Sequence, residues 1–111
     1  MPRRRANDKH RAVDKQEPVI GLLTIELHFP DFHSLKEKRM VVKAIKDRLR
    51  SRFNAAVAEI GYQDLWQRAL LAAVSISGDR RVLETLLEAM ARDVEQRYPP
   101  EWVQVSIELI D

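Results

Sequence analysis

The sequence predicts an α+β domain in which two helices cover one face of a four-stranded antiparallel sheet. The length and the cysteine content limit the possible folds, and the order of the apolar patterns predicts this one. The chain has 111 residues, which is enough for one domain. It contains no cysteine, so a disulfide framework, a thiol nucleophile and a Cys-built metal site are excluded. Its apolar patterns follow the order strand, helix, strand, strand, helix, strand, and two right-handed β-α-β crossovers place both helices on one face. This βαββαβ order is the ferredoxin-like arrangement.

The first strand and the first helix are predicted by two different periodicities. Residues 19–29 alternate, as in a strand with one buried face, and that face holds Leu23, Ile25, Leu27 and Phe29. Ser34 and Glu37 then form a capping-box pattern, with Ser34 as the N-cap and Glu37 reaching back to it. Apolar residues at helical spacing carry this helix to about Arg52; they are Val41, Val42, Ile45, Leu49 and Phe53.

The remaining elements follow in order. A short strand is predicted over residues 53–60, ended by Gly61, and a connection leads into a strand over residues 68–77. The segment Ser77–Asp79 ends this strand and supplies the cap of a second amphipathic helix, which Pro99 and Pro100 stop. Residues 103–109 alternate once more and form the last strand.

The net charge of +2 hides an uneven distribution. Residues 1–17 carry six basic and three acidic residues and no aromatic residue, so we expect a disordered basic tail ahead of a domain over residues 18–111. Residues 36–52 hold eight basic residues against Glu37 and Asp47, a net charge of +6. The rest of the domain is acidic.

A basic ridge is predicted beside the apolar stripe of the first helix. About 100° per residue places five cations within one arc of about 80°, along about 21 Å of helix. The ridge consists of Lys36, Arg39, Lys43, Lys46 and Arg50. Phosphates follow one another every ~3.4 Å along a nucleic-acid strand, so the ridge could meet several of them. The alternative is a solvated helix face, although such a face usually interleaves its charges.

Base stacking on the sheet, as in RRM domains, is not expected, because the two central strands offer no aromatic residue to the open face. No catalytic constellation is present, and three glycines cannot form a dinucleotide fingerprint. His28, Asp31 and His33 match no established ligand spacing. We therefore expect a non-catalytic protein without a metal or cofactor.

The connection before the third strand is a second candidate site. Tyr62 and Trp66 lie near Asp64 and Arg68, and loops of this kind often carry binding residues. A structural alternative is that Trp66 caps the core, Gly61 makes a turn, and Glu59 or Asp64 pairs with Arg68.

The third strand, residues 69–76, is apolar on both of its faces. Such strands occur in sheets that are covered on both sides. We therefore expect a second copy of the protein on the helix-free face; an apolar face that stays in contact with water is the alternative.

Three segments in register resemble the YlxP-like proteins, small bacterial proteins classed as a domain of unknown function. They are Gly21–Pro30, Ser34–Arg39 and Ala58–Arg68, and the resemblance covers residues 19–111. It implies a ferredoxin-like fold and no established catalytic residues. Members are often encoded beside translation and ribosome-maturation factors, which suggests a role near RNA.

Together these observations favour a cytoplasmic RNA- or ribosome-associated binding protein that uses the basic ridge. No apolar run reaches the ~18 residues of a membrane span. A homodimeric protein-interaction module is the alternative, and a small-molecule-binding regulatory domain is a third, weaker hypothesis that rests on fold analogy.

Overall fold

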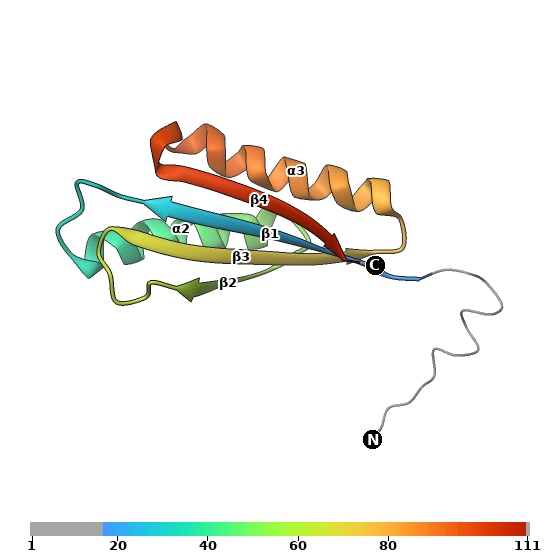
Figure 1. Ribbon diagram of the computed structural model, residues 1–111, viewed down its shortest axis with the longest axis horizontal. Helices are drawn as coiled ribbons and strands as arrows, with labels where there is room; N and C mark the ends of the chain where they lie inside the picture. Colours follow the sequence, from blue (N-terminus) through green and yellow to red (C-terminus); the bar gives the residue numbers. More distant parts are fainter. Residues whose placement is uncertain (1–16, 111) are drawn as a thin grey trace, which may run out of the picture.

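A computed structural model describes residues 17–110 of the chain (Figure 1). The elements in order are β1 (Val19–His28), α2 (Leu35–Arg52), β2 (Ala56–Gly61), β3 (Arg68–Ser77), α3 (Arg80–Arg97), the short 3-10 helix η1 (Pro100–Trp102) and β4 (Val103–Ile110). All strand pairs are antiparallel, in the spatial order β2-β3-β1-β4. The predicted ferredoxin-like fold class is therefore confirmed. The predicted tail over residues 1–17 lies, apart from Glu17, outside the described residues.

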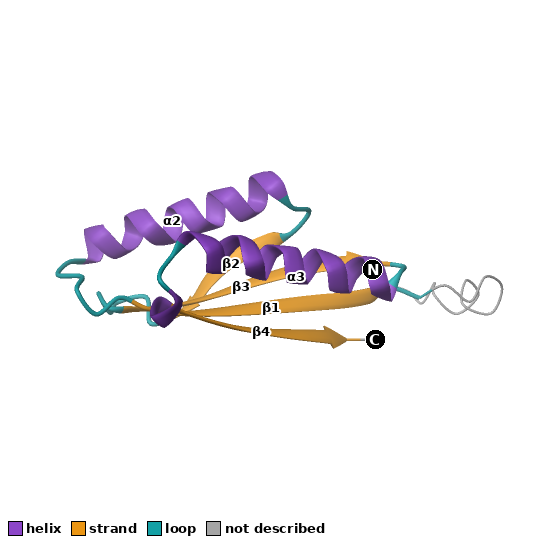
Figure 2. Cartoon of the chain, turned by 90° about the horizontal axis from the view of Figure 1, so that it is seen from above, coloured by secondary structure: helices purple, strands orange, loops and turns teal. Residues whose placement is uncertain are grey.

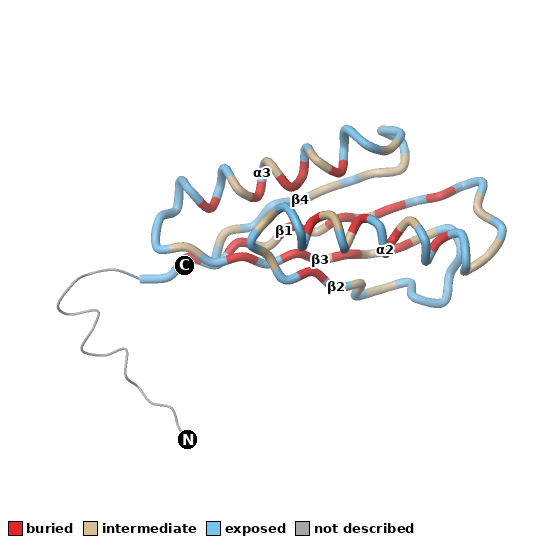
Figure 3. The backbone as a smooth tube through the Cα atoms, turned by 180° about the vertical axis from the view of Figure 1, so that it is seen from behind, coloured by how far each residue is buried: buried red, intermediate tan, exposed pale blue. Residues whose placement is uncertain are grey.

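Both helices lie on the same face of the sheet (Figure 2). The core forms between them and the two central strands. Leu23, Ile25 and Leu27 of β1 are buried there, and α3 contributes Leu83 and Leu87. The buried stretches in Figure 3 run along β1 and β3 and along one side of each helix. The alternation seen in the sequence thus selects the face of β1 that the helices cover.

The two helix starts are fixed by side-chain caps, because the first backbone N–H groups of a helix lack partners within it. Ser34 Oγ accepts from the Glu37 N–H at 3.2 Å, as the capping box predicts. The Glu37 carboxylate reaches one residue further back than predicted and accepts from the His33 N–H at 2.6 Å. Asp79 caps α3 by accepting from the N–H groups of Arg81 and Val82.

The predicted strand over residues 53–60 is wrong at its start. The Phe53 N–H donates to the Leu49 carbonyl at 3.0 Å, which closes the last turn of α2, and β2 begins at Ala56. At its other end, Gly61 lies across from Leu70 at a register shift. Tyr62, with φ of 59°, then supplies the left-handed turn conformation that usually favours glycine.

The opposite side of the sheet, here called the helix-free face, is defined by the strand register. Thr24 pairs with Ala72 of β3 and with Ser106 of β4. Directly paired residues share a face, and alternate residues of a strand point to opposite faces. Because Leu23 and Ile25 point to the helices, Thr24 and its partners point away from them. This face has no helix over it in Figure 2.

Candidate nucleic-acid interface

The basic ridge runs along the outer edge of the sheet. The buried stripe of α2, which includes Val42, Ile45 and Leu49, faces the core. The ridge lies to one side of this stripe, and Arg50 shows which side, because its Nη2 donates to the Val57 carbonyl of β2 at 2.6 Å. Since β2 is an edge strand, the ridge borders the rim of the molecule. Nucleic acid could approach it there without displacing an element of the fold.

Three cations of the ridge are available for a ligand. Lys36 and Arg39 are exposed and Lys46 is partly exposed, and none of the three makes a hydrogen bond or ion pair with another described residue. Lys43 pairs with Asp47 at 2.5 Å. Its hydrogen bond, together with the positive charges of Lys43, Arg50 and Lys46, holds the pKa of the Asp47 carboxyl below its usual value, against a smaller opposing effect of desolvation. All five predicted cations therefore belong to the ridge, and one of them, Lys43, is paired with an acidic residue.

Arg48 and Arg52, on the other side of the stripe, connect the two helices. Arg48 donates from Nε at 2.8 Å and from Nη2 at 3.0 Å to the carboxylate of Asp93 on α3. The Arg52 Nε lies 3.9 Å from the same carboxylate. A two-pronged arginine–carboxylate contact is among the stronger side-chain hydrogen bonds. These two cations therefore serve the packing of α2 against α3.

Lys38 has a role that the sequence analysis missed. It is 1% exposed, and its Nζ donates to three backbone carbonyls, those of Tyr62 at 2.7 Å, Arg68 at 3.0 Å and Gln63 at 3.2 Å. A signal was present, because Lys38 is in helical phase with the buried Val42, Ile45 and Leu49. The first turns of α2 are thereby tied to the connection between β2 and β3.

The charge of Lys38 is balanced by Glu59 of β2. Its Oε2 lies 3.2 Å from the ammonium nitrogen, and the Glu59 side chain is 17% exposed. This oxygen satisfies no hydrogen-bond geometry. The three ammonium protons are directed at the three carbonyls instead. Glu59 therefore contributes charge compensation, which a buried ammonium requires.

The connecting loop differs from its predicted structural alternative. Arg68 pairs with Glu26 of β1, so neither Glu59 nor Asp64 is its partner. The Arg68 guanidinium also lies 4.0 Å above the centroid of the Tyr62 ring, in a cation–π contact. Trp66 is 50% exposed and does not cap the core. The predicted structural alternative, in which Trp66 caps the core and Arg68 pairs with Glu59 or Asp64, is therefore wrong.

Another aromatic cluster closes the core near this end of the sheet. Phe29 and Phe32 stack with ring centroids 4.5 Å apart, and Trp102 meets the Phe29 ring edge-on at 5.2 Å. The Tyr98 ring stacks on Trp102, with ring centroids 6.1 Å apart. The predicted burial of Phe29 is confirmed. Its contact with Trp102 could not be predicted, because the two rings meet only when η1 folds back beside the end of β1. Trp102, and not Trp66, therefore packs against the rings at this end of the core.

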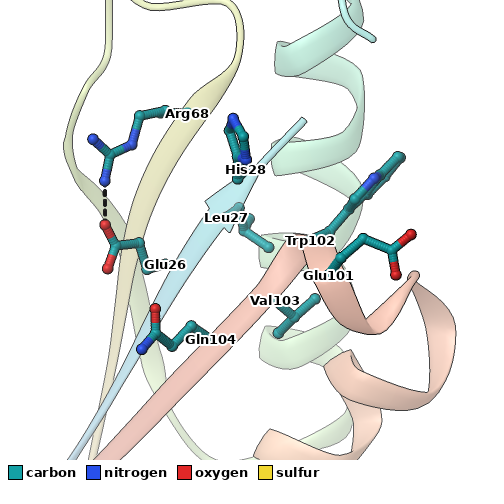
Figure 4. A pocket seen from close by; sticks show the side chains of 8 residues that line it. All are labelled: Glu26, Leu27, His28, Arg68, Glu101, Trp102, Val103 and Gln104. Atoms are coloured by element: carbon teal, nitrogen blue, oxygen red, sulfur yellow. Dashed lines mark hydrogen bonds and ion pairs between the residues drawn. The ribbon is translucent and has the colours of Figure 1, made fainter. Parts of the chain in front are cut away.

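Two adjoining hollows lie beside Arg68 and His28. One, of about 420 Å³, is lined by the loop residues Asp64, Leu65, Trp66 and Gln67. The other, of about 550 Å³, is bordered by Glu26, Glu101, Trp102 and Gln104 (Figure 4). In Figure 4 Glu26 and Gln104 point to the opposite side of the sheet from Leu27 and Val103. Glu26 and Arg68 neutralise each other, and Glu101 and Asp64 leave the lining of the two hollows net negative, so this surface does not suit an anionic ligand.

Residues 17–110 also bear on metal binding and on membrane insertion. No group of three or more His, Asp or Glu residues in this range is placed to hold a metal ion. Neither of its long helices has an apolar stretch sufficient to cross a membrane. Among the described residues, the concentration of unpaired cations on α2 thus stands out as a candidate for recognition of a charged ligand.

The fold and the ridge define a class of protein: a small ferredoxin-like domain with a cationic edge. Residues 20–107 match the family described as "Protein of unknown function (DUF503)", and the chain belongs to this family. Over 70 residues it is 41% identical to the uncharacterized protein YlxP of Bacillus subtilis (strain 168), covering 63% of this chain and 76% of that protein. The predicted YlxP-like resemblance is confirmed.

A likeness to a solved structure concerns the fold alone. The chain is similar to the de novo designed protein Foldit4, with a TM-score of 0.54 and 14% sequence identity. The match covers 86% of this chain and 98% of the designed one. The shared feature is the backbone arrangement, since identity at this level carries no information about a site.

Proposed function

We propose that this protein is a non-catalytic RNA-binding protein, associated with RNA or with a ribosomal subunit, whose contact surface is the basic ridge of α2. The observation that carries the proposal is the run of five cations along one side of the helix, of which Lys36, Arg39 and Lys46 have no partner among the described residues. Cations kept without internal partners at the rim of a domain suit the binding of an anionic polymer.

The ridge would act by neutralising backbone phosphates. Each neutralised phosphate releases counterions, so the binding constant falls as salt rises, by a slope of about 0.7–0.9 per contact on logarithmic axes. Three to five contacts thus correspond to a slope of about 2–4.5. Phosphate contacts position a nucleic acid without reading its bases. We therefore expect weak sequence preference and a strong dependence on ionic strength.

A matched pair of variants tests the proposal. Arg39→Glu/Lys46→Glu reverses two ridge cations, and Arg81→Glu/Arg92→Glu makes the same change in net charge on exposed residues of α3. By anisotropy of a labelled structured RNA at about 50 mM salt, we expect the ridge variant to lose at least about tenfold in affinity. The α3 variant should stay within about threefold. An equal loss in both variants, or no binding by the native chain at low salt, contradicts the proposal.

Association with the ribosome is tested separately, in a lysate. Sedimentation through a sucrose cushion should carry the native chain with a ribosomal subunit at low salt and release it at high salt. The ridge variant should remain in the supernatant at both. If the native chain binds RNA but does not cosediment, the electrostatic mechanism is supported and a ribosomal subunit is excluded as the partner.

A second candidate function, docking of a protein partner by the loop of Tyr62, Asp64, Trp66 and Arg68, is favoured by one observation. Trp66 is half exposed on a loop that the buried Lys38 holds in place. A rigid, exposed tryptophan is a common interface anchor. Trp66→Ala should leave the unfolding midpoint unchanged and lose a partner that Met40→Ala retains. Loss of folding in Trp66→Ala would exclude this candidate.

A further inference from the structure

The helix-free face of the sheet is apolar and uncovered in the single chain. Five large apolar side chains on it are exposed: Ile76 by 58%, Ile60 by 54%, Ile110 by 47%, Val74 by 39% and Ile20 by 38%. They come from all four strands, because Ile20 pairs with both Ile76 and Ile110, and Val74 pairs with Ala56 of the strand that carries Ile60. The residues therefore form one surface. Contiguous apolar surfaces of this kind are uncommon on monomers and mark interaction sites.

The dimensions of this face suit a protein interface. Four strands spaced by about 4.8 Å, with about 3.3 Å per residue along strands of six to ten residues, cover about 500–600 Å² in projection. The accessible area is larger, because side chains stand out from the sheet. It approaches the ~800 Å² per partner that a standard interface buries. Small side chains, those of Ala56 and Ala58 on β2 and of Ala72 on β3, lie beside the large ones on this face.

The charge pattern of the face favours a second copy of the chain as its partner. On the described strands, the charged residues of this face are Glu26, Arg68 and Glu108, and Glu26 and Arg68 neutralise each other. A two-fold axis brings a surface against itself, so unpaired like charges near the centre would repel. The central residues Thr24 and Ala72 carry no charge. RNA is a poor fit, because the one cation of the face is already paired.

We infer that a second copy of this chain covers the helix-free face, forming a two-fold symmetric dimer in which the two sheets pack face to face. Stacked sheets lie about 10 Å apart, with the facing side chains interdigitated. The helices then lie on the two outer surfaces. The basic ridge of each copy stays uncovered, so this inference does not depend on RNA binding. A monomeric protein could still bind RNA, and a dimer could fail to do so.

Sedimentation equilibrium of the full chain tests the dimer. At about 20–50 µM the native protein should sediment at twice the chain mass of 12.9 kDa. Ile76→Lys places a charge in the proposed interface and should weaken the dimer by at least about 100-fold. Met40→Lys and Val82→Lys introduce the same charge at residues of α2 and α3 that are 65% and 57% exposed. These two controls should remain dimeric.

The other outcomes overturn the inference. A native chain that is monomeric at about 100 µM excludes a stable second copy on this face. A dimer that persists in Ile76→Lys places the interface elsewhere, and dissociation in Met40→Lys shows that added charge alone is sufficient. Should Ile76→Lys lose its circular dichroism spectrum, Ile60→Lys on the neighbouring edge strand repeats the test. A native monomer that captures a different protein through this face also contradicts the inference.

Discussion

The two long helices have the same length and cover the same face of one sheet, yet they carry very different charge. Both α2 and α3 contain 18 residues and bury one apolar stripe. In α2 eight basic residues stand against two acidic ones, whereas α3 carries four of each. Because α3 is stable in the same architecture with a balanced surface, covering the sheet does not require the excess charge of α2. That excess is the feature of α2 on which the proposed RNA binding rests.

The eight cations of α2 fall into three groups by what they contact. Lys38 is buried against the loop carbonyls, Arg48 and Arg52 face Asp93 of α3, and the five ridge cations border β2. The first two groups are needed for folding and packing. The ridge alone differs from anything on α3. Three predictions separate these groups, from the largest expected effect to the smallest.

Lys38→Met should have the largest effect. It leaves three carbonyl oxygens without a donor and Glu59 without its counter-charge, and breaking a buried pair typically costs about 3–5 kcal/mol of unfolding free energy. Lys36→Met, an exposed cation two residues earlier, should cost at most about 0.5 kcal/mol. Urea unfolding measures both. The double variant Lys38→Met/Glu59→Gln should recover part of the loss, and equal stability of the two lysine variants would contradict the assignment of Lys38.

Asp93→Ala should have an intermediate effect. It removes the bidentate partner of Arg48, with contacts of 2.8–3.1 Å, from a side chain that is 12% exposed. Hydrogen bonds to charged groups contribute about 1.5–3 kcal/mol, so thermal unfolding should show a loss of that order. Glu88→Ala, an exposed carboxylate on the same helix, is the control. A comparable loss of stability in both variants would mean that the loss comes from the changed charge of α3 and not from the broken contact with α2.

Asp47→Asn should have the smallest effect, and it has the opposite sign. It unmasks Lys43 without adding a side chain, so the affinity for RNA should rise by about two- to fivefold at low salt. Because the Lys43 hydrogen bond lowers the pKa of Asp47, mild acidification of the native protein should not reproduce this gain. Glu95→Gln makes the same charge change on α3 and should leave anisotropy titrations unchanged. If the affinity for RNA rises equally in both variants, the gain comes from the net charge of the protein and not from the ridge.

Most of the fold could be predicted because its signals are local. Alternation in residues 19–29 and the helical spacing from Val42 to Leu49 each need only near neighbours in the chain. The caps at Ser34 and Asp79 are equally local. The start of β2 was misplaced because Phe53 and Ala55 continue the apolar pattern, while the hydrogen bond from Phe53 to Leu49 assigns that stretch to the end of α2.

The site could be predicted only in part, and for a physical reason. The ridge depends on helical phase, so its members follow from spacing, and the structure leaves three of them unpaired. The partner of Arg68 is Glu26, 42 positions away, and the register of β1 with β3 brings the two together. No local pattern contains that register. The exposure of Trp66 was likewise undecidable, because Trp102 and not Trp66 joins the Phe29 and Phe32 rings.

By itself, the sequence determined the order of elements, the buried stripe of each helix and the uneven charge of α2, since all of these depend on residues within a few turns or one strand. The tertiary structure decided which of these charges are free. Burial of Lys38 under the loop and pairing of Arg48 with Asp93 require elements far apart in the chain to meet. The cost of leaving a buried charge unpaired selects those partners once the helices dock. The cations that find no partner remain at the edge of the sheet.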